Sequence, residues 1–245
     1  GVTLTESGKA ALRQAEHILQ AVSELGHGAD TARDSIRGKL VIATPNTTRH
    51  AFTEFIPAFQ TRFPQVSLEI LEAHSRLTYE WLLEGRADIG ILHDPTLTRG
   101  IQRIPLFDEP LLLVSRSDLA PVPASAQWPF RSLAGLPLIL PDEHHSIRAA
   151  VEAQAKRSRI KLRVVLQVQG GQLILDLVQQ GHGHAILPAT SVKLRGARDL
   201  LQLNEIVEPR LMRGRCLAIA EHRPDTRLLR EARKLLRHYL GGRDY

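Results

Sequence analysis

The sequence is poor in cysteine and in aromatic residues. Its 245 residues include one cysteine, Cys216, so a disulfide within the chain is excluded, and the apolar run 216–220 around it predicts a buried structural thiol. Only 4% of the residues are aromatic, which is too few for the stacking platforms that bind single-stranded nucleic acids. Direct RNA binding is therefore disfavoured.

Long apolar runs are also missing. No stretch of about 18 consecutive apolar residues occurs, and the N-terminus lacks the apolar segment of a secretory signal peptide. We therefore expect a soluble, cytoplasmic protein with no membrane partner. Because the sequence opens at Gly1 and its first residues look like a loop that enters a helix, we expect a fragment of a longer chain.

The overall composition is that of an ordinary globular protein. Hydrophobic residues make up 43% and charged residues 24%, which excludes a disordered or fibrous chain. The formal net charge of +6 favours an acidic partner or an anionic ligand, because the field of the whole molecule raises the local concentration of anions. The length allows one domain or two lobes of roughly 100 residues each.

Residues 6–37 have the apolar spacing of one long helix, and Thr5 is placed to cap its start. Its apolar residues form two neighbouring rows, and together they give a face wider than one partner surface would use. We therefore predict a dimerisation helix; the alternative is an amphipathic helix that packs on its own domain. The residues assigned to the dimer contact are Leu12, Ala15, Ile18, Leu19, Val22 and Leu25.

After Gly38 the pattern changes to short apolar runs that alternate with helical stretches, which is typical of a parallel sheet covered by helices. The first such unit is predicted to have strands at 40–43, 66–71 and 88–92 and helices at 52–63 and 77–83. The second is predicted to have strands at 136–140, 162–166 and 184–187 and helices at 147–156 and 173–178.

These two βαβαβ units predict an α/β fold of two Rossmann-like lobes with a cleft, preceded by the dimerisation helix. Residues 105–114 and 217–220 are expected to cross between the lobes, and 228–239 to form a last amphipathic helix. The predicted divisions are 1–37 for the dimerisation helix, 38–110 with 218–245 for lobe I, and 111–217 for lobe II. Clefts between lobes are favoured places for small ligands.

Several stretches of the sequence carry recognisable motifs. FQTRFPQV at 59–66 and LEGRADIG at 83–90 match the patterns F-x-x-x-(Y/F)-P-x-V and L-x-x-G-x-(L/A)-D-(L/I/V), and LVQQGHGHAILP at 177–188 is a third such segment. In these motifs and in their order the sequence resembles the bacterial LysR-type transcriptional regulators. Residues 4–12 and 38–43 resemble that family's entry to the linker helix and its first regulatory strand, so the resemblance covers nearly the whole chain.

The resemblance implies a sensor domain with the fold of the type 2 periplasmic binding proteins, and a winged helix-turn-helix domain that binds DNA and is missing from this sequence. The implied partners are a small-molecule effector, other copies of the chain in a homodimer or homotetramer, DNA through the missing domain, and RNA polymerase. No cofactor is implied. Residues 140–148 resemble the branch that includes nitrogen-assimilation and cyanate-type regulators.

Ligands of such proteins meet the carboxyl ends of strands and the N-termini of helices, where backbone N–H groups favour anions. The residues at such places that we assign to effector binding are Thr44, Asn46, Thr47, His74, Ser75, His144, His145, Ser146, Arg148, Gln169 and Gly170. Each has an ordinary alternative: hydroxyls cap helices, arginines pair with carboxylates, and glycines make turns. An anionic metabolite bound between the lobes is expected to shift the oligomer and so transcription.

Histidines at 144–145 and 182–184 raise the question of a metal site. No cysteine or carboxylate cluster with ligand spacing accompanies them, so no metal is expected. The alternatives to a sensor are a hydrolase that uses Ser75, Ser146 and a histidine, and a solute-binding protein of a transporter. No nucleophile elbow or P-loop is present, and a linker helix argues against export, so we expect neither.

The last predicted helix carries a basic face that could touch DNA phosphates. A charge run of this kind is usually a solvated surface, and we predict that here. The residues are Arg227, Arg230, Lys234 and Arg237.

Overall fold

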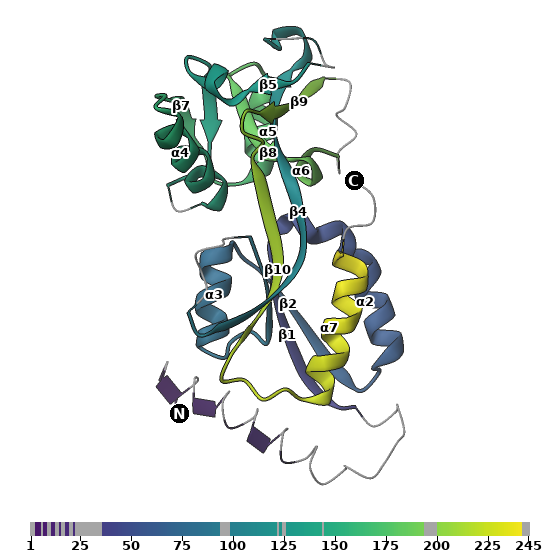
Figure 1. Ribbon diagram of the computed structural model, residues 1–245. Coiled ribbons are helices and arrows are strands. Elements are labelled where there is room, and N and C mark those ends of the chain that lie inside the picture. The colour runs from purple at the N-terminus through teal and green to yellow at the C-terminus, as the bar shows by residue number, and fades with distance from the viewer. Residues whose placement is uncertain are drawn as a thin grey trace. The chain divides into compact units, whose positions relative to one another are not determined.

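The computed structural model (Figure 1) describes residues 36–93, 99–121, 123, 126–143, 145–193 and 200–241, with positions 3–5, 7–8, 11–12, 15, 18–19 and 22 near the N-terminus. The described positions between Ser7 and Val22 are helical, as predicted. Leu25 and His144 lie outside the described residues. Within these ranges no helix has the length and apolar character needed to cross a lipid bilayer.

The chain folds into two compact α/β units. Unit 1 holds the described residues up to Phe107 and those from Arg215 on, and unit 2 is Asp108–Gly214. Two strands, β4 (Ile101–Arg116) and β10 (Met212–Ala220), contribute residues to both units. The domain boundaries expected at 110/111 and 217/218 fall within these two strands.

The sheet of unit 1 has the strand order β2-β1-β3-β10. β1 (Gly38–Thr44) pairs in parallel with β2 (Val66–Glu72), β3 (Ile89–Leu92) is parallel to β1, and β10 is antiparallel to β3. Helix α2 (Arg49–Arg62) connects β1 to β2, and α3 (Ser75–Leu83) connects β2 to β3. This is the order that the periodicity predicts.

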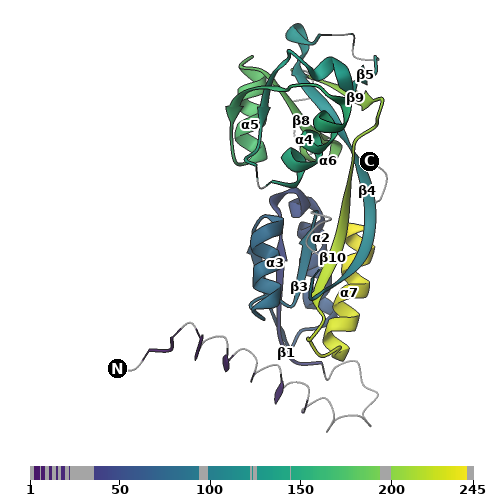
Figure 2. The same cartoon turned by 60° about the vertical axis from the view of Figure 1, so that its left-hand side comes forward.

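Alternation along β1 gives the sheet of unit 1 two apolar faces. Leu40 and Ile42 belong to one buried cluster with α2 and α7 (Arg227–Leu240). Val41 and Ala43 belong to another with α3 and with Cys216, which is buried as predicted. Helices α2 and α7 therefore cover one face of the sheet and α3 covers the other (Figures 1 and 2).

Asp88, the aspartate of the LEGRADIG stretch, connects three parts of unit 1. It is 2% exposed; its Oδ2 accepts a hydrogen bond of 2.7 Å from the N–H of Val41, and its Oδ1 forms an ion pair with Arg223. Burial lowers the pKa of Arg223, and the charge of Asp88 opposes that shift. A buried charge is unfavourable without its partner. We therefore assign Asp88 to the stability of unit 1, where it balances the charge of Arg223.

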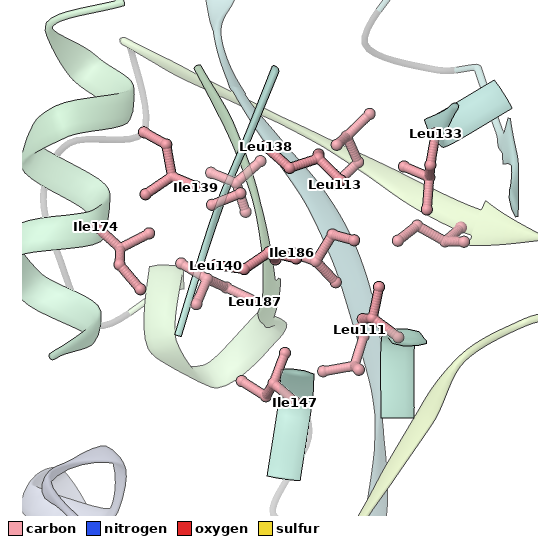
Figure 3. Packing of buried hydrophobic residues seen from close by; sticks show 14 of the residues in the cluster. Leu111, Leu113, Leu133, Leu138, Ile139, Leu140, Ile147, Ile174, Ile186 and Leu187 are labelled. Carbon is pink, nitrogen blue, oxygen red and sulfur yellow. The ribbon is translucent and has the colours of Figure 1, made fainter. Parts of the chain in front are cut away.

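The sheet of unit 2 has the strand order β4-β8-β6-β7. β6 (Pro137–Leu140) lies between β7 (Arg163–Gln167) and β8 (His184–Pro188) and is parallel to both, and β8 is antiparallel to β4. Helices α4 (Ser146–Ser158) and α5 (Gly171–Gln179) connect these strands. In Figure 3, Ile147 of α4 and Ile174 of α5 lie among the leucines and isoleucines of the strands, in one buried cluster.

Two strands and one α-helix of unit 2 are not predicted by the sequence pattern: β5 (Trp128–Pro129), β9 (Leu201–Val207) and α6 (Ala189–Lys193). β9 pairs with β4 and β5. Its buried Asn204 donates hydrogen bonds of 3.0 and 2.7 Å to the carbonyl oxygens of Pro123 and Ala126. Asn204 is a polar residue at a buried position of β9. It interrupts the alternation of apolar and polar residues by which a strand is recognised in the sequence, so β9 is not predicted.

Replacing Asp88 with asparagine is expected to destabilise unit 1 by about 3–5 kcal/mol, because the change leaves the charge of Arg223 buried without a carboxylate. Urea unfolding in a Trp128→Phe background measures this change, since Trp81 then reports on unit 1 alone. Glu80→Gln breaks the exposed pair with Arg76 and should cost less than about 1 kcal/mol. Equal losses in the two variants would contradict the structural role of Asp88.

Candidate functional site

The carboxyl ends of β1 and β2 bring two predicted tracts together in unit 1. The strands are parallel and in register, so Thr44 lies opposite Glu72. The N–H of Ala73 donates to the carbonyl oxygen of Thr44 at 3.0 Å, and the side-chain amide of Asn46 donates to Glu72 at 3.0 Å. The two tracts therefore form one polar edge.

The threonine hydroxyls at this edge are held within their own loop. The hydroxyl of Thr48 donates to the carbonyl oxygen of Pro45 at 2.8 Å, and its oxygen also contacts the hydroxyl of the buried Thr44. No side chain caps the start of α2, so the capping alternative for these hydroxyls is wrong. The hydroxyl oxygen of Thr47 is buried and has no hydrogen-bond partner among the described residues.

His74 and Ser75 begin α3 at the same edge. His74 is the N-cap, and its Nδ1 accepts a hydrogen bond of 3.4 Å from the N–H of Leu77, which places the proton of the neutral ring on Nε2. Ser75 is not the cap; its Oγ accepts a hydrogen bond of 3.0 Å from the N–H of His93, which follows β3. The buried His93 is not assigned to the site from the sequence. It could have been found in the same way as the other site residues, because it is a polar residue that directly follows an apolar strand.

The carboxyl ends of β6 and β7 bring the remaining tracts together in unit 2. Leu140 lies opposite Gln167 at the ends of these strands. β6 leads through His145 into α4, and β7 leads through Gln169 and Gly170 into α5, so both helices begin at this edge. The backbone N–H groups and the positive dipole end of each helix favour a negative group there.

Two of the predicted residues in unit 2 have structural roles. Nδ1 of His145 caps α4 by accepting a hydrogen bond of 3.2 Å from the N–H of Ile147. Gly170 precedes α5 with φ at 98°, a conformation that favours glycine. A Cβ at Gly170 would meet no described atom within 4 Å, so the space beside this exposed backbone is open.

Arg148 places a buried positive charge at the edge of unit 2. It is 8% exposed, and its Nε donates to Oε1 of Glu152 at 2.5 Å. The predicted alternative, an ion pair, is therefore present. However, the side chain of Glu152 is 46% exposed, and Nη1 of Arg148 is buried without a hydrogen-bond partner among the described residues. An unsatisfied buried donor costs about 1–3 kcal/mol, so this N–H group favours an additional acceptor.

A second buried charge cluster in unit 2 is not predicted by the sequence. Glu109 of β4 accepts hydrogen bonds of 2.6 Å from Arg213 of β10 and of 2.6 Å from Thr190 of α6, and all three residues are buried. Burial lowers the pKa of Arg213, and the charge of Glu109 opposes that shift. Nε of Arg213 has no acceptor among the described residues, but the buried charges of Arg213 and Glu109 compensate each other, so we assign this cluster to the stability of unit 2.

The question of a metal site can be examined at the described histidines 145, 182 and 184. In the part of the chain that the structure describes, no three His, Cys, Asp or Glu side chains are arranged to hold a metal. His184 is buried in β8, where its Nδ1 lies 2.8 Å from the hydroxyl oxygen of Ser115. Burial lowers the pKa of His184.

Two α/β units with polar loops at the carboxyl edges of their sheets define a small-molecule-binding domain of the type 2 periplasmic-binding-protein kind. Residues 33–241 match the model of the LysR substrate binding domain, and the chain therefore belongs to the LysR family of transcriptional regulators. This family consists of effector-binding transcription factors and not of enzymes, so the hydrolase alternative is excluded.

Curated relatives agree with this assignment. The HTH-type transcriptional regulator Cbl of Escherichia coli K12 is 30% identical over 207 residues, which cover 82% of this chain and 64% of Cbl. The nitrogen assimilation regulatory protein Nac of Klebsiella aerogenes is 25% identical over 197 residues, which cover 79% of this chain and 63% of Nac. The chain thus spans somewhat less than two thirds of the length of these relatives. The resemblance to nitrogen-assimilation regulators is confirmed.

Solved structures share the fold. The regulatory domain of Synechocystis PCC6803 CcmR, in complex with 2-PG, matches with a TM-score of 0.75 at 19% identity, over 83% of this chain and 98% of that chain. The cofactor-binding domain of Cbl matches with a TM-score of 0.72 at 22% identity, over 84% and 91%. The fold predicted from the sequence is therefore confirmed.

The stability of unit 2 is expected to fall as the pH is lowered, in part because of His184. Its folded-state pKa lies below the ordinary value of 6.5, so the unfolded chain takes up a proton at a higher pH than the folded chain does. The stabilisation is complete above the unfolded-state value and is lost as the pH falls through the folded-state pKa. Urea unfolding followed by Trp128 fluorescence in a Trp81→Phe background measures it.

Replacing His184 with glutamine should reduce this pH dependence, whereas His222→Gln, at an exposed position, should leave it unchanged. An unaltered pH dependence in the His184 variant would show that other groups are responsible.

Proposed function

We propose that the chain senses a small anionic metabolite and that polar groups at the carboxyl edges of its sheets bind it. The observation that carries this proposal is the guanidinium of Arg148, which is buried and has no acceptor for Nη1 among the described residues. A carboxylate, sulfate or phosphate oxygen would satisfy that N–H group with a charge-assisted hydrogen bond, which is stronger than a neutral one.

The surroundings of Arg148 suit such a group. The N-termini of α4 and α5 lie at the same sheet edge, and their backbone N–H groups and dipoles add to the positive potential. Ser146 in the first turn of α4 supplies a hydroxyl, and the open space beside Gly170 admits close approach to the backbone. The net charge of +6 attracts anions from a distance. In unit 2, His144, His145 and Gln169 complete the proposed contacts.

The edge of unit 1 offers neutral polar groups. The buried hydroxyl of Thr47 lacks a partner among the described residues, and Nε2 of His74 carries a proton that can be donated. Asn46 and Ser75 are already engaged in hydrogen bonds, and the hydroxyl of Thr44 is taken up by its contact with Thr48. We therefore propose Thr47 and His74 as the main contacts of this edge, with Asn46, Ser75 and Thr44 as their support.

A ligand changes transcription only if it binds two conformations with different affinity. We propose that the effector selects one conformation of the sensor, and that this choice alters the geometry of a homodimer or homotetramer. The DNA contact would be made by a winged helix-turn-helix domain, and RNA polymerase is a further partner. The complex of the CcmR regulatory domain with 2-PG supports the small-molecule part of this proposal.

The test is the melting temperature of the chain against a panel of inorganic sulfate, inorganic phosphate and short carboxylates. At about 100 times its Kd a ligand stabilises the folded state by about 2.7 kcal/mol, which corresponds to a rise of about 5–10 °C. Since sulfate also stabilises proteins non-specifically at high concentration, the rise must saturate. Arg148→Gln and Ser146→Ala are expected to reduce it.

The matched control is Arg157→Gln, which removes one charge from the exposed side of the same helix and should leave the rise intact. A full rise in both site variants would overturn the assignment of the edge of unit 2, and so would equal losses in the site and control variants. If Arg148→Gln does not fold, Ser146→Ala decides the outcome.

The N-terminal helix is proposed as the dimer contact because its apolar residues are exposed in the single chain. The exposed fractions are 49% for Leu12, 59% for Ile18, 67% for Leu19 and 57% for Val22, and Ala15 is also exposed. A run of apolar residues of this size on one helix is typical of a coiled-coil contact.

Replacing Leu19 and Val22 with aspartate is expected to dissociate the oligomer, because buried carboxylates at the contact would be unfavourable. Sedimentation velocity measures the change in mass. Leu119→Asp, at an apolar residue of unit 2 that is 48% exposed, is the control and should preserve the oligomer. An oligomer that persists in the double variant would place the contact elsewhere.

A further inference from the structure

A strongly basic segment lies in unit 2, at the end of α4 and the start of β7. It comprises Lys156, Arg157, Arg159, Lys161 and Arg163, and all five residues are exposed. β7 is the end strand of its sheet (Figure 1), so this segment lies at an open edge of the unit. We call these five residues the basic segment.

The charge of the basic segment is not balanced by acidic residues. No aspartate or glutamate occurs between Glu152 and Asp176. None of the five residues forms a salt bridge with a described carboxylate; Arg157 donates a hydrogen bond of 3.0 Å to Gln154, which is neutral. Five positive charges thus face solvent without an ion pair to any carboxylate that the structure describes.

Helix α7 provides a contrast, because its basic residues are largely paired. Arg230 and Arg233 share Asp225, and Lys234 pairs with Glu231 at 2.7 Å. Its charge is therefore partly neutralised within the fold, in agreement with the solvated surface that the sequence predicts. The unpaired basic segment presents the stronger local attraction for a polyanion.

The backbone at Arg159 is a second unusual feature of the basic segment. Arg159 ends α4 with φ at 54°, in the left-handed region, where its N–H donates to the carbonyl oxygens of Ala155 and Lys156. Glycine is the residue that adopts this conformation without steric strain. Arginine is strained in this conformation, and it adds a positive charge that glycine would not. The backbone geometry at this position therefore does not explain why the residue is an arginine.

Structural roles account for only part of this charge. Cations in the last turn of a helix offset its dipole, which explains Lys156 and Arg157, but the effect does not extend beyond that turn to Lys161 and Arg163. Charged residues also protect an edge strand from pairing with another chain. Lysine is especially common in that role, so protection accounts for a positive charge beside β7, but it does not call for five such charges.

We propose that the basic segment binds the phosphate backbone of double-stranded DNA, independently of base sequence. Arginine and lysine side chains supply such contacts without reading the bases. Single strands are a poorer fit, because residues 131–238 contain no aromatic side chain on which bases could stack. An acidic protein surface is also a poorer fit, since protein interfaces depend on aromatic anchors. This proposal does not rest on the effector site.

The test measures binding of the chain to a labelled DNA duplex of random sequence by fluorescence anisotropy, from about 50 to 200 mM salt. The segment variant carries Arg157→Gln, Lys161→Gln and Arg163→Gln. Each lost phosphate contact lowers the slope of log K against log salt concentration by about 1, so a decrease of about 3 is expected. The control variant carries Arg230→Gln, Lys234→Gln and Arg237→Gln, has the same net charge, and should keep the slope of the unaltered chain.

Melting temperatures establish that each variant is folded, and Lys156→Gln with Lys161→Gln replaces the triple variant if it is not. Equal loss of binding in the segment and control variants would mean that net charge alone attracts DNA, and would overturn the proposal. No salt-dependent binding by the unaltered chain would also overturn it. Tighter binding of poly-glutamate than of the duplex, lost in the segment variant, would identify an acidic protein as the partner instead.

Discussion

The parallel pairing of β1 with β2, and of β6 with β7, is the constraint on which the functional account depends. Both strands of a parallel pair end at the same edge of the sheet, so the register fixes Thr44 opposite Glu72 and Leu140 opposite Gln167. In unit 1, β1 packs Leu40 and Ile42 against α2 and α7, and Val41 and Ala43 against α3, so a slip by one residue would exchange the two buried sets. Tracts that are distant in the sequence thereby form one polar edge in each unit.

Three buried arginines differ in the carboxylates that they face, and this difference indicates which of them serve stability. Arg223 and Arg213 each face a carboxylate that is itself buried, Asp88 and Glu109, so the two charges of each pair compensate one another. Nε of Arg213 and Nη1 of Arg148 are both buried without an acceptor among the described residues, but Arg148 differs in its carboxylate partner, because Glu152 is half exposed. The buried carboxylates balance the charges of the first two arginines, whereas for the third we propose that a bound anion completes the balance.

Most of the fold could be predicted from the sequence, because apolar periodicity reports directly on strands and helices that bury one or both faces. Gly183 lies in the segment 177–188 that the resemblance singled out, but its structural reason is a distant contact, since a Cβ there would lie 2.7 Å from the carbonyl oxygen of Pro137. What could not be predicted depends on distant partners. The pairing of Glu109 with Arg213, and the burial of one nitrogen of Arg148, follow from packing between segments and leave no local signal.

The most direct test of the anion site is amide hydrogen exchange with and without the anion that raises the melting temperature most. An anion held by Arg148 and the two helix N-termini should slow exchange in the first turns of α4 and α5, at residues 146, 148 and 171–173, because it would occupy backbone N–H groups there, whereas Ile147, Ala149 and Ile174 already donate within the fold. Slower exchange confined to residues 156–163, or none at the edge of unit 2, would contradict the account.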